Sequence, residues 1–221
     1  MKRWIALAIA VIVSGSLQAA DKEAGVVQIT NPELLSALQN PKASQTAERS
    51  PLAFENGSSA KNCAEYSELL AKTKPVESTR NFEIRSEYLL CDSMRLVADK
   101  PFVAGKASTA GRLAKTLHAK LDLRSFPSSL RNRADGKHHT LKTLLPGTAQ
   151  SKGNAVQVET PDQFFRLEVV GIIDQGKGKK QDLIVWVTDE LKNGSYRGYN
   201  NIVVHPPRSS AGLYTVSASP R

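Results

Sequence analysis

The sequence predicts an α+β protein in which helices come first and an antiparallel sheet follows. Three observations predict this order: apolar residues recur at helical spacing up to about residue 121, β-branched and aromatic runs follow from about residue 155, and turn residues separate those runs at short intervals. Short intervals favour an antiparallel meander, because parallel strands need long crossover connections. With 221 residues, 40% of them hydrophobic, the chain can bury a core, and wholesale disorder is excluded.

Residues 1–20 have the three zones of a secretory signal peptide. Lys2 and Arg3 give a positive start, and an apolar run and a small-residue exit follow. The apolar run has about ten residues, whereas a membrane-spanning helix needs about 20. We therefore expect cleavage near Ala19 or Ala20, a periplasmic location, and no transmembrane segment in the mature protein.

Residues 21–60 are rich in Ser, Ala and polar residues and predict a flexible N-terminal arm. Residues 61–150 form a predicted helical part. Its first helix is capped by Asn62 and ends before Pro75, and Asn81 is placed to cap a second helix. Acidic residues of the second helix, including Asp92, are interpreted as surface groups.

Cys63 and Cys91 are the only cysteines, one in each of these two helices. An even number of cysteines in an exported chain predicts a disulfide, which would join the first helix to the middle of the second. A loop of about 29 residues gives roughly 3–4 kcal/mol of stabilisation in the chain-entropy model. A redox role would favour a Cys-x-x-Cys pair, which is absent.

A third helix is predicted to start at Ser108 or Thr109 and to run to Leu121. Leu113 and Leu117 share its buried edge with Leu121. Its other face is basic, and a basic loop follows. The candidate binding residues of this basic segment are Arg112, Lys115, Lys120, Arg124, Arg131, Arg133 and Lys137.

The charge is concentrated in this segment. The formal net charge of +9 becomes +7 once the signal is removed, and residues 101–150 hold nine basic and two acidic side chains. Residues 21–100 carry −2 and residues 151–221 carry +2, so they cancel. The segment is either a solvated surface or an electrostatic docking site. Export and a single aromatic residue among the basic side chains between residues 112 and 142, Phe126, argue against nucleic acid as the partner.

Residues 151–221 form the predicted antiparallel β part, either a second layer of one domain with residues 61–150 or a small domain of its own. The predicted strands, separated by turns, are 155–158, 164–173, 183–187, 196–204 and 213–216.

The loop between two of these strands reads Asp174-Gln-Gly-Lys-Gly-Lys-Lys-Gln-Asp182-Leu183. With its apolar flanks (about residues 166–187) it resembles a degenerate calcium-loop repeat of the FG-GAP type, as in the C-terminal part of exported bacterial proteins of unknown role. The matching positions are Asp174, Asp182 and Leu183. Glycines replace the middle oxygen ligands and three lysines occupy the loop, so we predict no metal site.

No spacing of His, Cys or acidic residues predicts a metal centre, and no nucleophile or phosphate-binding motif is present, so we assign no catalytic residue and no cofactor. We expect a periplasmic binding protein of inhibitor or immunity type, without catalytic activity, that docks an acidic envelope or secreted protein through the basic segment. Two alternatives stay open: an envelope-associated protein that binds anionic lipid or glycan, and a hydrolase whose site is assembled from distant residues, such as His138 or His205.

Overall fold

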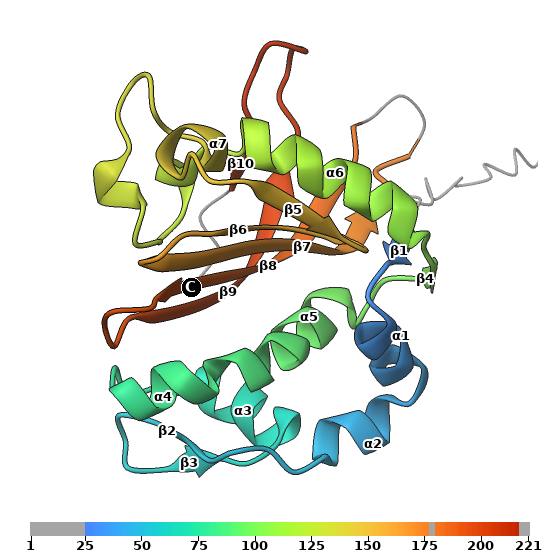
Figure 1. Ribbon diagram of the computed structural model, residues 1–221. Helices are drawn as coiled ribbons and strands as arrows, with labels where there is room; N and C mark the ends of the chain where they lie inside the picture. The colour runs from blue at the N-terminus through green and yellow to red at the C-terminus, as the bar shows by residue number, and fades with distance from the viewer. Residues whose placement is uncertain (1–24, 177–179, 217–221) are drawn as a thin grey trace, which may run out of the picture.

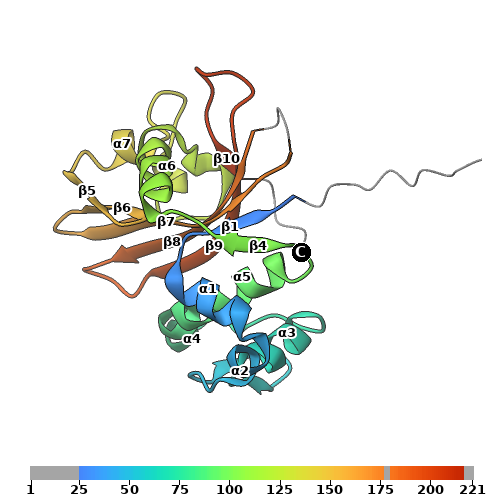
Figure 2. The ribbon, with the colours of Figure 1, turned by 90° about the vertical axis from the view of Figure 1, so that its right-hand side faces the viewer.

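The computed structural model describes residues 25–176 and 180–216. In it the chain has three layers, with a sheet in the middle, one group of helices below it and another helical segment above it (Figures 1 and 2). The predicted signal peptide and the middle of the Asp174–Asp182 loop lie outside the described residues. No helix of the described part is long and apolar enough to span a membrane.

The sheet strands are β1 (Val27–Ile29), β4 (Phe102–Ala104), β5 (Ala149–Lys152), β6 (Ala155–Glu159), β7 (Gln163–Ile173), β8 (Asp182–Leu191), β9 (Arg197–His205) and β10 (Thr215–Val216). Their order is β10-β9-β8-β7-β1-β4, with β6 and then β5 added beside β7. The strands β5 to β10 are antiparallel neighbours in chain order, which confirms the meander.

The sheet also extends beyond the predicted β part. β1 pairs with β7 in antiparallel and with β4 in parallel orientation, so residues from the first half of the chain complete it. β1 and β4 have three residues each, too few for an alternating pattern to be seen in the sequence. The α+β class is confirmed, but the sheet is mostly rather than wholly antiparallel.

The helices below the sheet are α1 (Pro32–Gln39), α2 (Pro41–Thr46), α3 (Cys63–Leu70), α4 (Thr79–Ile84), the 3-10 helix η1 (Arg85–Tyr88) and α5 (Leu89–Val97). A small hairpin of β2 (Leu52–Ala53) and β3 (Ser59–Ala60) joins them. The helical segments above the sheet are α6 (Ala107–Lys120), the 3-10 helices η2 (Leu123–Ser125) and η3 (Arg131–Arg133), and α7 (Leu141–Leu144).

The expected arm at residues 21–60 is wrong for its described part. Leu34, Leu52 and Phe54 are at most 1% exposed and belong to the hydrophobic core between the sheet and the helices below it, called here the lower core, so the segments on both sides of α2 are part of the folded structure. Long-range bonds hold this polar segment, because the Tyr88 hydroxyl donates to the carbonyl oxygens of Ser50 and Ala60 at 2.8 Å each. Such contacts cannot be read from the segment's own composition.

The second predicted helix is divided into α4, η1 and α5, and its cap is Ser78 rather than Asn81. Asn81 is buried, and its amide group accepts a bond from the Ala53 nitrogen at 3.1 Å and donates to the oxygens of Ala53 and Val76 at 2.8 Å. An asparagine side chain can cap a helix or form hydrogen bonds with the backbone of another segment. In this protein Asn81 does the second.

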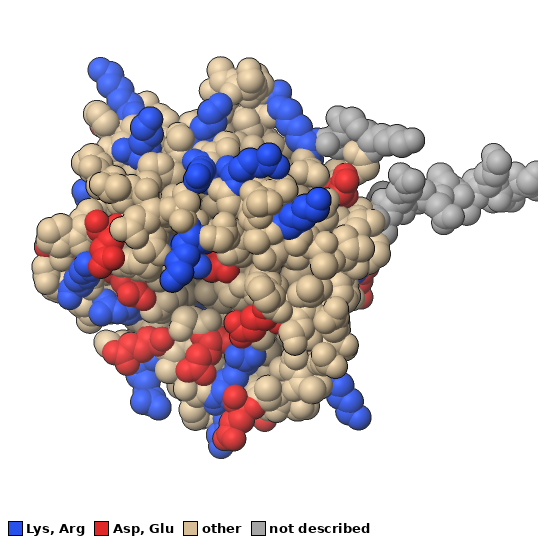
Figure 3. Space-filling model, turned by 45° about the vertical axis from the view of Figure 1, so that its right-hand side comes forward, with Lys and Arg blue, Asp and Glu red and all other residues tan. Residues whose placement is uncertain are grey.

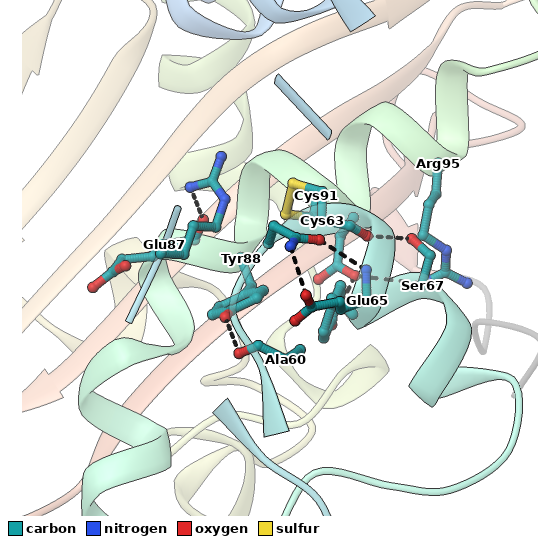
Figure 4. The surroundings of a disulfide bond; sticks show 12 residues. Ala60, Cys63, Glu65, Ser67, Glu87, Tyr88, Cys91 and Arg95 are labelled. Carbon is teal, nitrogen blue, oxygen red and sulfur yellow. Dashed lines mark hydrogen bonds and ion pairs between the residues drawn. A yellow bond between two sulfur atoms is a disulfide. The ribbon is translucent and has the colours of Figure 1, made fainter. Parts of the chain in front are cut away.

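Cys63 and Cys91 form the predicted disulfide, with their Cα atoms 5.1 Å apart. The bond connects the first turn of α3 to α5, and Figure 4 shows Tyr88 and Arg95 on opposite sides of it. Tyr66 of α3 packs against Tyr88 with ring centroids 4.9 Å apart. The disulfide therefore lies within the lower core.

A bulge in β7 changes which of its residues face each core. The register of β7 against β8 shifts between Val169 and Gly171, so the alternation changes phase: Val169 and Ile172 pack in the core above the sheet, and Val170 and Ile173 in the core below it. The bulge is fixed from outside the sheet: the Thr30 nitrogen donates to the Val170 oxygen at 2.9 Å, and the Asn154 amide to the Val169 oxygen at 3.1 Å.

Candidate binding site on the basic face of helix α6

Helix α6 carries the centre of the basic segment and packs on the upper face of the sheet. Its inward positions are small or apolar: Ala110, Gly111, Ala114 and Leu117 are buried. A Cβ atom on Gly111 would lie 2.4 Å from the Gly153 oxygen, which shows how closely the helix approaches the β5–β6 turn. This packing fixes the direction in which the opposite, basic face points.

Arg112 and Lys115 lie on that outward face, and both are exposed. Neither takes part in an ion pair within the described part of the chain. Helix α6 itself contains no acidic residue. Figure 3 shows Lys and Arg side chains gathered over the upper half of the molecule, where α6 lies, with most acidic side chains lower down. These two charges are available to a partner.

The charge of Arg124 is largely used within the protein. Its Nε and Nη2 donate to the two carboxylate oxygens of Asp122 at 2.8 Å each, and Nη1 donates to the Asp135 oxygen at 3.2 Å. Hydrogen bonds from Arg124 hold the pKa of Asp122 below its usual value. Arg124 is thus a structural side chain more than a free cation.

The remaining predicted residues lie in two places. Arg131, Arg133 and Lys137 are exposed in and after η3, and Arg133 makes long bonds of 3.5 Å to the Leu144 oxygen and the Gln163 side chain. Lys120, at the end of α6, donates to the Ser210 oxygen at 2.8 Å. The structure therefore divides the seven residues among the α6 face, the η2–η3 loop and a cavity wall.

That cavity has a volume of about 940 Å³ and lies between α6, the start of β8 and the β9–β10 connection. Its residues are Leu113, Thr116, Lys120, Asp174, Gly176, Lys180, Gln181, Leu183, Pro206, Pro207, Ser209, Ser210 and Tyr214. Lys120 and Lys180 both donate to carbonyl oxygens of the β9–β10 connection, those of Ser210 and Pro207. Leu113, Leu183 and Tyr214 make part of the wall apolar, and Asp174 is an acidic residue in the same wall as the two lysines.

Two of the histidines, His205 and His138, form pairs with carboxylates. His205 Nδ1 lies 2.8 Å from Asp182 on the neighbouring strand, and the other oxygen of Asp182 accepts a bond from Gln175 at 2.7 Å. His138 lies 3.2 Å from Asp135, whose pKa is lowered to about 2 mainly by the backbone N–H groups of His138 and Lys137. Neither pair lines the cavity.

His139 Nδ1 lies 3.2 Å from the backbone oxygen of Asp135, and the fourth histidine, His118 on α6, is partly buried. The Nε2 of His118 has no partner among the described residues, and burial, helped by the positive charge of Lys142, lowers its pKa. In the described ranges, no three His, Cys, Asp or Glu side chains come together as metal ligands would. We assign no reaction to these residues.

A second hollow was missed by sequence analysis. It lies between α5 and β9 and is lined by Arg85, Asp92 and Arg95, with two asparagines of β9. Asp92 is not the exposed group that was expected, because only 16% of its side chain is accessible. The sequence offers one indication of this hollow: Asp92 precedes Arg95 by three positions, so both lie on the same face of a helix.

Comparison of the chain with protein-family models, curated proteins and solved structures found no match.

Proposed function

We propose that the protein is an exported, periplasmic binding protein of inhibitor or immunity type, which docks an acidic protein through the α6 face. The observation that carries the proposal is the pair Arg112 and Lys115, exposed and without an acidic partner among the described residues, on a helix that also lines the 940 Å³ cavity. The proposed role involves no chemistry of the protein's own.

The charges and the cavity would act at different stages of binding. Exposed cations accelerate association with an acidic protein surface and orient the two proteins relative to each other. Salt weakens this attraction by screening the charges. The cavity then offers apolar groups such as Leu113 and Tyr214 to a side chain of the partner, with Lys120 and Lys180 in the wall. Burial of an anchor in a pocket supplies most of the affinity in many protein interfaces.

Export is part of this proposal. The disulfide between Cys63 and Cys91 persists in oxidising compartments, and it agrees with the signal peptide predicted for residues 1–20. An envelope partner would therefore be a protein of the same compartment or a secreted enzyme.

The first test is capture from an envelope fraction with the mature protein, with the double variant Arg112→Glu/Lys115→Glu alongside it. Lys42→Glu/Lys72→Glu is the matched control, because both lysines are exposed in the lower layer. We expect one acidic protein to be captured by wild type and by the control, and lost with the α6 variant.

Other outcomes would contradict the proposal. Salt-sensitive binding to anionic vesicles or glycans, without a protein, would identify an envelope-associated protein instead. Turnover of an envelope substrate that is lost in His205→Ala would favour a hydrolase. Equal loss of capture in the α6 variant and the control would show non-specific attraction.

A further inference from the structure

Strand β5 has a free edge beside the basic face of α6. Among the described strands it pairs only with β6, and all four of its residues are exposed. Figures 1 and 2 show β5 at the outer end of the sheet, below α6 and α7. Proteins usually cover or shorten such an edge, because its unpaired backbone groups can bond to another strand.

The hydrogen bonds of the neighbouring strands show which backbone groups of β5 face outward. The Val169 nitrogen donates to the Asn154 oxygen at 3.0 Å, and this pair continues the register of β6 against β7. Bonded pairs alternate between antiparallel strands, so even-numbered residues of β6 bond to β7 and odd-numbered ones to β5. Their partners on β5 are its even-numbered residues. The N–H and C=O groups of Ala149 and Ser151 therefore point away from the sheet, and no described residue bonds to them.

The side chains of these two residues leave space beneath the helices. Ala149 and Ser151 lie opposite Val158 and Val156, which pack in the core above the sheet, so all four side chains point to the side of α6. Both edge residues are small and exposed. A strand added beside β5 would have every second side chain on this same side.

Three lysines surround the free edge. Lys115 is one helical turn after Gly111, whose Cβ would lie 2.4 Å from the Gly153 oxygen, so Lys115 is on the flank of α6 that faces the β5–β6 turn. Lys142 lies on α7, which packs against α6, and Lys152 ends β5. All three are exposed and form no ion pair within the described ranges. The elements α6, α7 and β5 contain no acidic residue.

These features define what would complement the edge. Outward N–H and C=O groups at alternate residues match the backbone of an extended chain. Lysines without acidic partners match carboxylates on that chain. A second copy of the protein does not supply them, because its own β5 edge would bring the same lysines against these.

We propose that an extended acidic segment of the partner adds to the sheet as a strand beside β5. This inference rests on the proposed function, because it specifies how the acidic protein docked by the α6 face is held. The backbone groups of Ala149 and Ser151 bond to the segment, and its acidic side chains on the helix side pair with Lys115 and Lys142.

The test follows chemical shifts and hydrogen exchange of backbone amides in the mature protein with three synthetic peptides. The first is acetyl-Thr-Glu-Val-Glu-Val-Glu-Thr-amide, and the second has lysine in place of each glutamate. The third is the first peptide with N-methyl groups on its three central residues. We expect saturable shifts and slower exchange at the Ala149 and Ser151 amides with the first peptide, bound at least about tenfold more tightly than the other two.

Variants locate the site. Ser151→Pro removes an outward N–H that makes no bond to β6, so the sheet should stay folded and the acidic peptide should bind at least about tenfold more weakly. Ser151→Ala keeps this N–H and should bind as wild type. Lys115→Gln/Lys142→Gln should weaken binding about tenfold at low salt, whereas Lys42→Gln/Lys72→Gln, in the lower layer, should not. If Ser151→Pro fails to fold, the N-methylated peptide tests the same backbone bonds on wild type.

The proposal is overturned if the acidic peptide leaves these amides unchanged up to about 5 mM, or if either control peptide binds as tightly. It is also overturned if folded Ser151→Pro binds as wild type, or if it dissociates a dimer of the wild type, since the occupant is then a second copy. Capture of an acidic protein through Arg112 and Lys115 would still support the proposed function in these cases. Peptide binding as expected, without capture of an acidic protein, would support strand addition and contradict the proposed function.

Discussion

Asp189 of β8 is a fully buried carboxylate, so it needs hydrogen-bond donors around it. It accepts hydrogen bonds from the nitrogen and hydroxyl of Ser129 at 2.7 Å each, and from the Gln163 amide at 2.8 Å. These bonds tie the loop before η3 to the sheet. The orientation of part of the basic segment therefore depends on one acidic side chain of β8.

Replacement of Asp189 by Asn should destabilise the protein by about 2 kcal/mol, because an amide N–H₂ would face donors that now find carboxylate oxygens. Urea unfolding measures this change. Asp99→Asn, at an exposed position, is the control and should stay within about 0.5 kcal/mol of wild type. Equal effects of the two variants would contradict this reading of the network.

Tyr88 gives the protein a predicted sensitivity to alkali. Burial, with the nearby negative charge of Glu87, raises the pKa of Tyr88 to about 12. Since its ordinary pKa is about 10, its contribution to stability is complete below about pH 10 and is lost as pH rises toward 12. Tyr88→Phe should lower stability at neutral pH and decline less steeply above pH 10, as measured by urea unfolding. An unchanged slope would contradict the assignment.

At the scale of elements, helix α6 follows from its sequence. Leu117 and Leu121 are buried as predicted, Leu113 is only partly buried, and the helix begins one residue before the predicted start. The divided helix at residues 79–97 does not follow, because the position of Asn81 depends on Ala53, 28 residues earlier. Local spacing identifies a helix, whereas contacts distant in sequence decide where it is broken.

The close approach of α6 to the sheet gives a prediction for Gly111. Alanine there would raise helix propensity, but its Cβ would lie 2.4 Å from the Gly153 backbone oxygen, so the helix must move. We expect Gly111→Ala to lower the free energy of unfolding by about 1–3 kcal/mol in urea. Gly136→Ala, with no atom within 4 Å of the new Cβ, should be nearly neutral. A stabilised Gly111→Ala protein would show that this packing is looser than described.

The disulfide between Cys63 and Cys91 connects the two helices α3 and α5. Cys63→Ala/Cys91→Ala should lower stability by roughly 3–4 kcal/mol, because the unfolded chain regains the freedom of a loop closed over 28 positions. Thermal unfolding with and without reductant measures this in wild type, and the variant should be insensitive to reductant. A change well below about 1 kcal/mol would show that the lower core does not need this bond.

At the scale of the whole molecule, the sequence predicts the fold class, the disulfide and the location of positive charge. It does not predict that residues 25–39 complete the sheet and the layer below it, since β1 is held by pairing with β7 and α1 by packing in the lower core. The residues that line the α5–β9 hollow come from two segments far apart in the sequence, so the sequence alone does not show that they lie together. The α6 face was predictable because one helix carries both its buried and its charged side.

We propose that Arg112 and Lys115 on α6 attract and orient an acidic protein. The most direct measurement is the association-rate constant with the purified, captured partner at about 20 mM and about 300 mM salt. For wild type and Lys42→Glu/Lys72→Glu, we expect fast association that falls steeply with salt. Arg112→Glu/Lys115→Glu should associate at least about tenfold more slowly at low salt, with little salt dependence. Equal rates and equal salt dependence in all three proteins would contradict the claim.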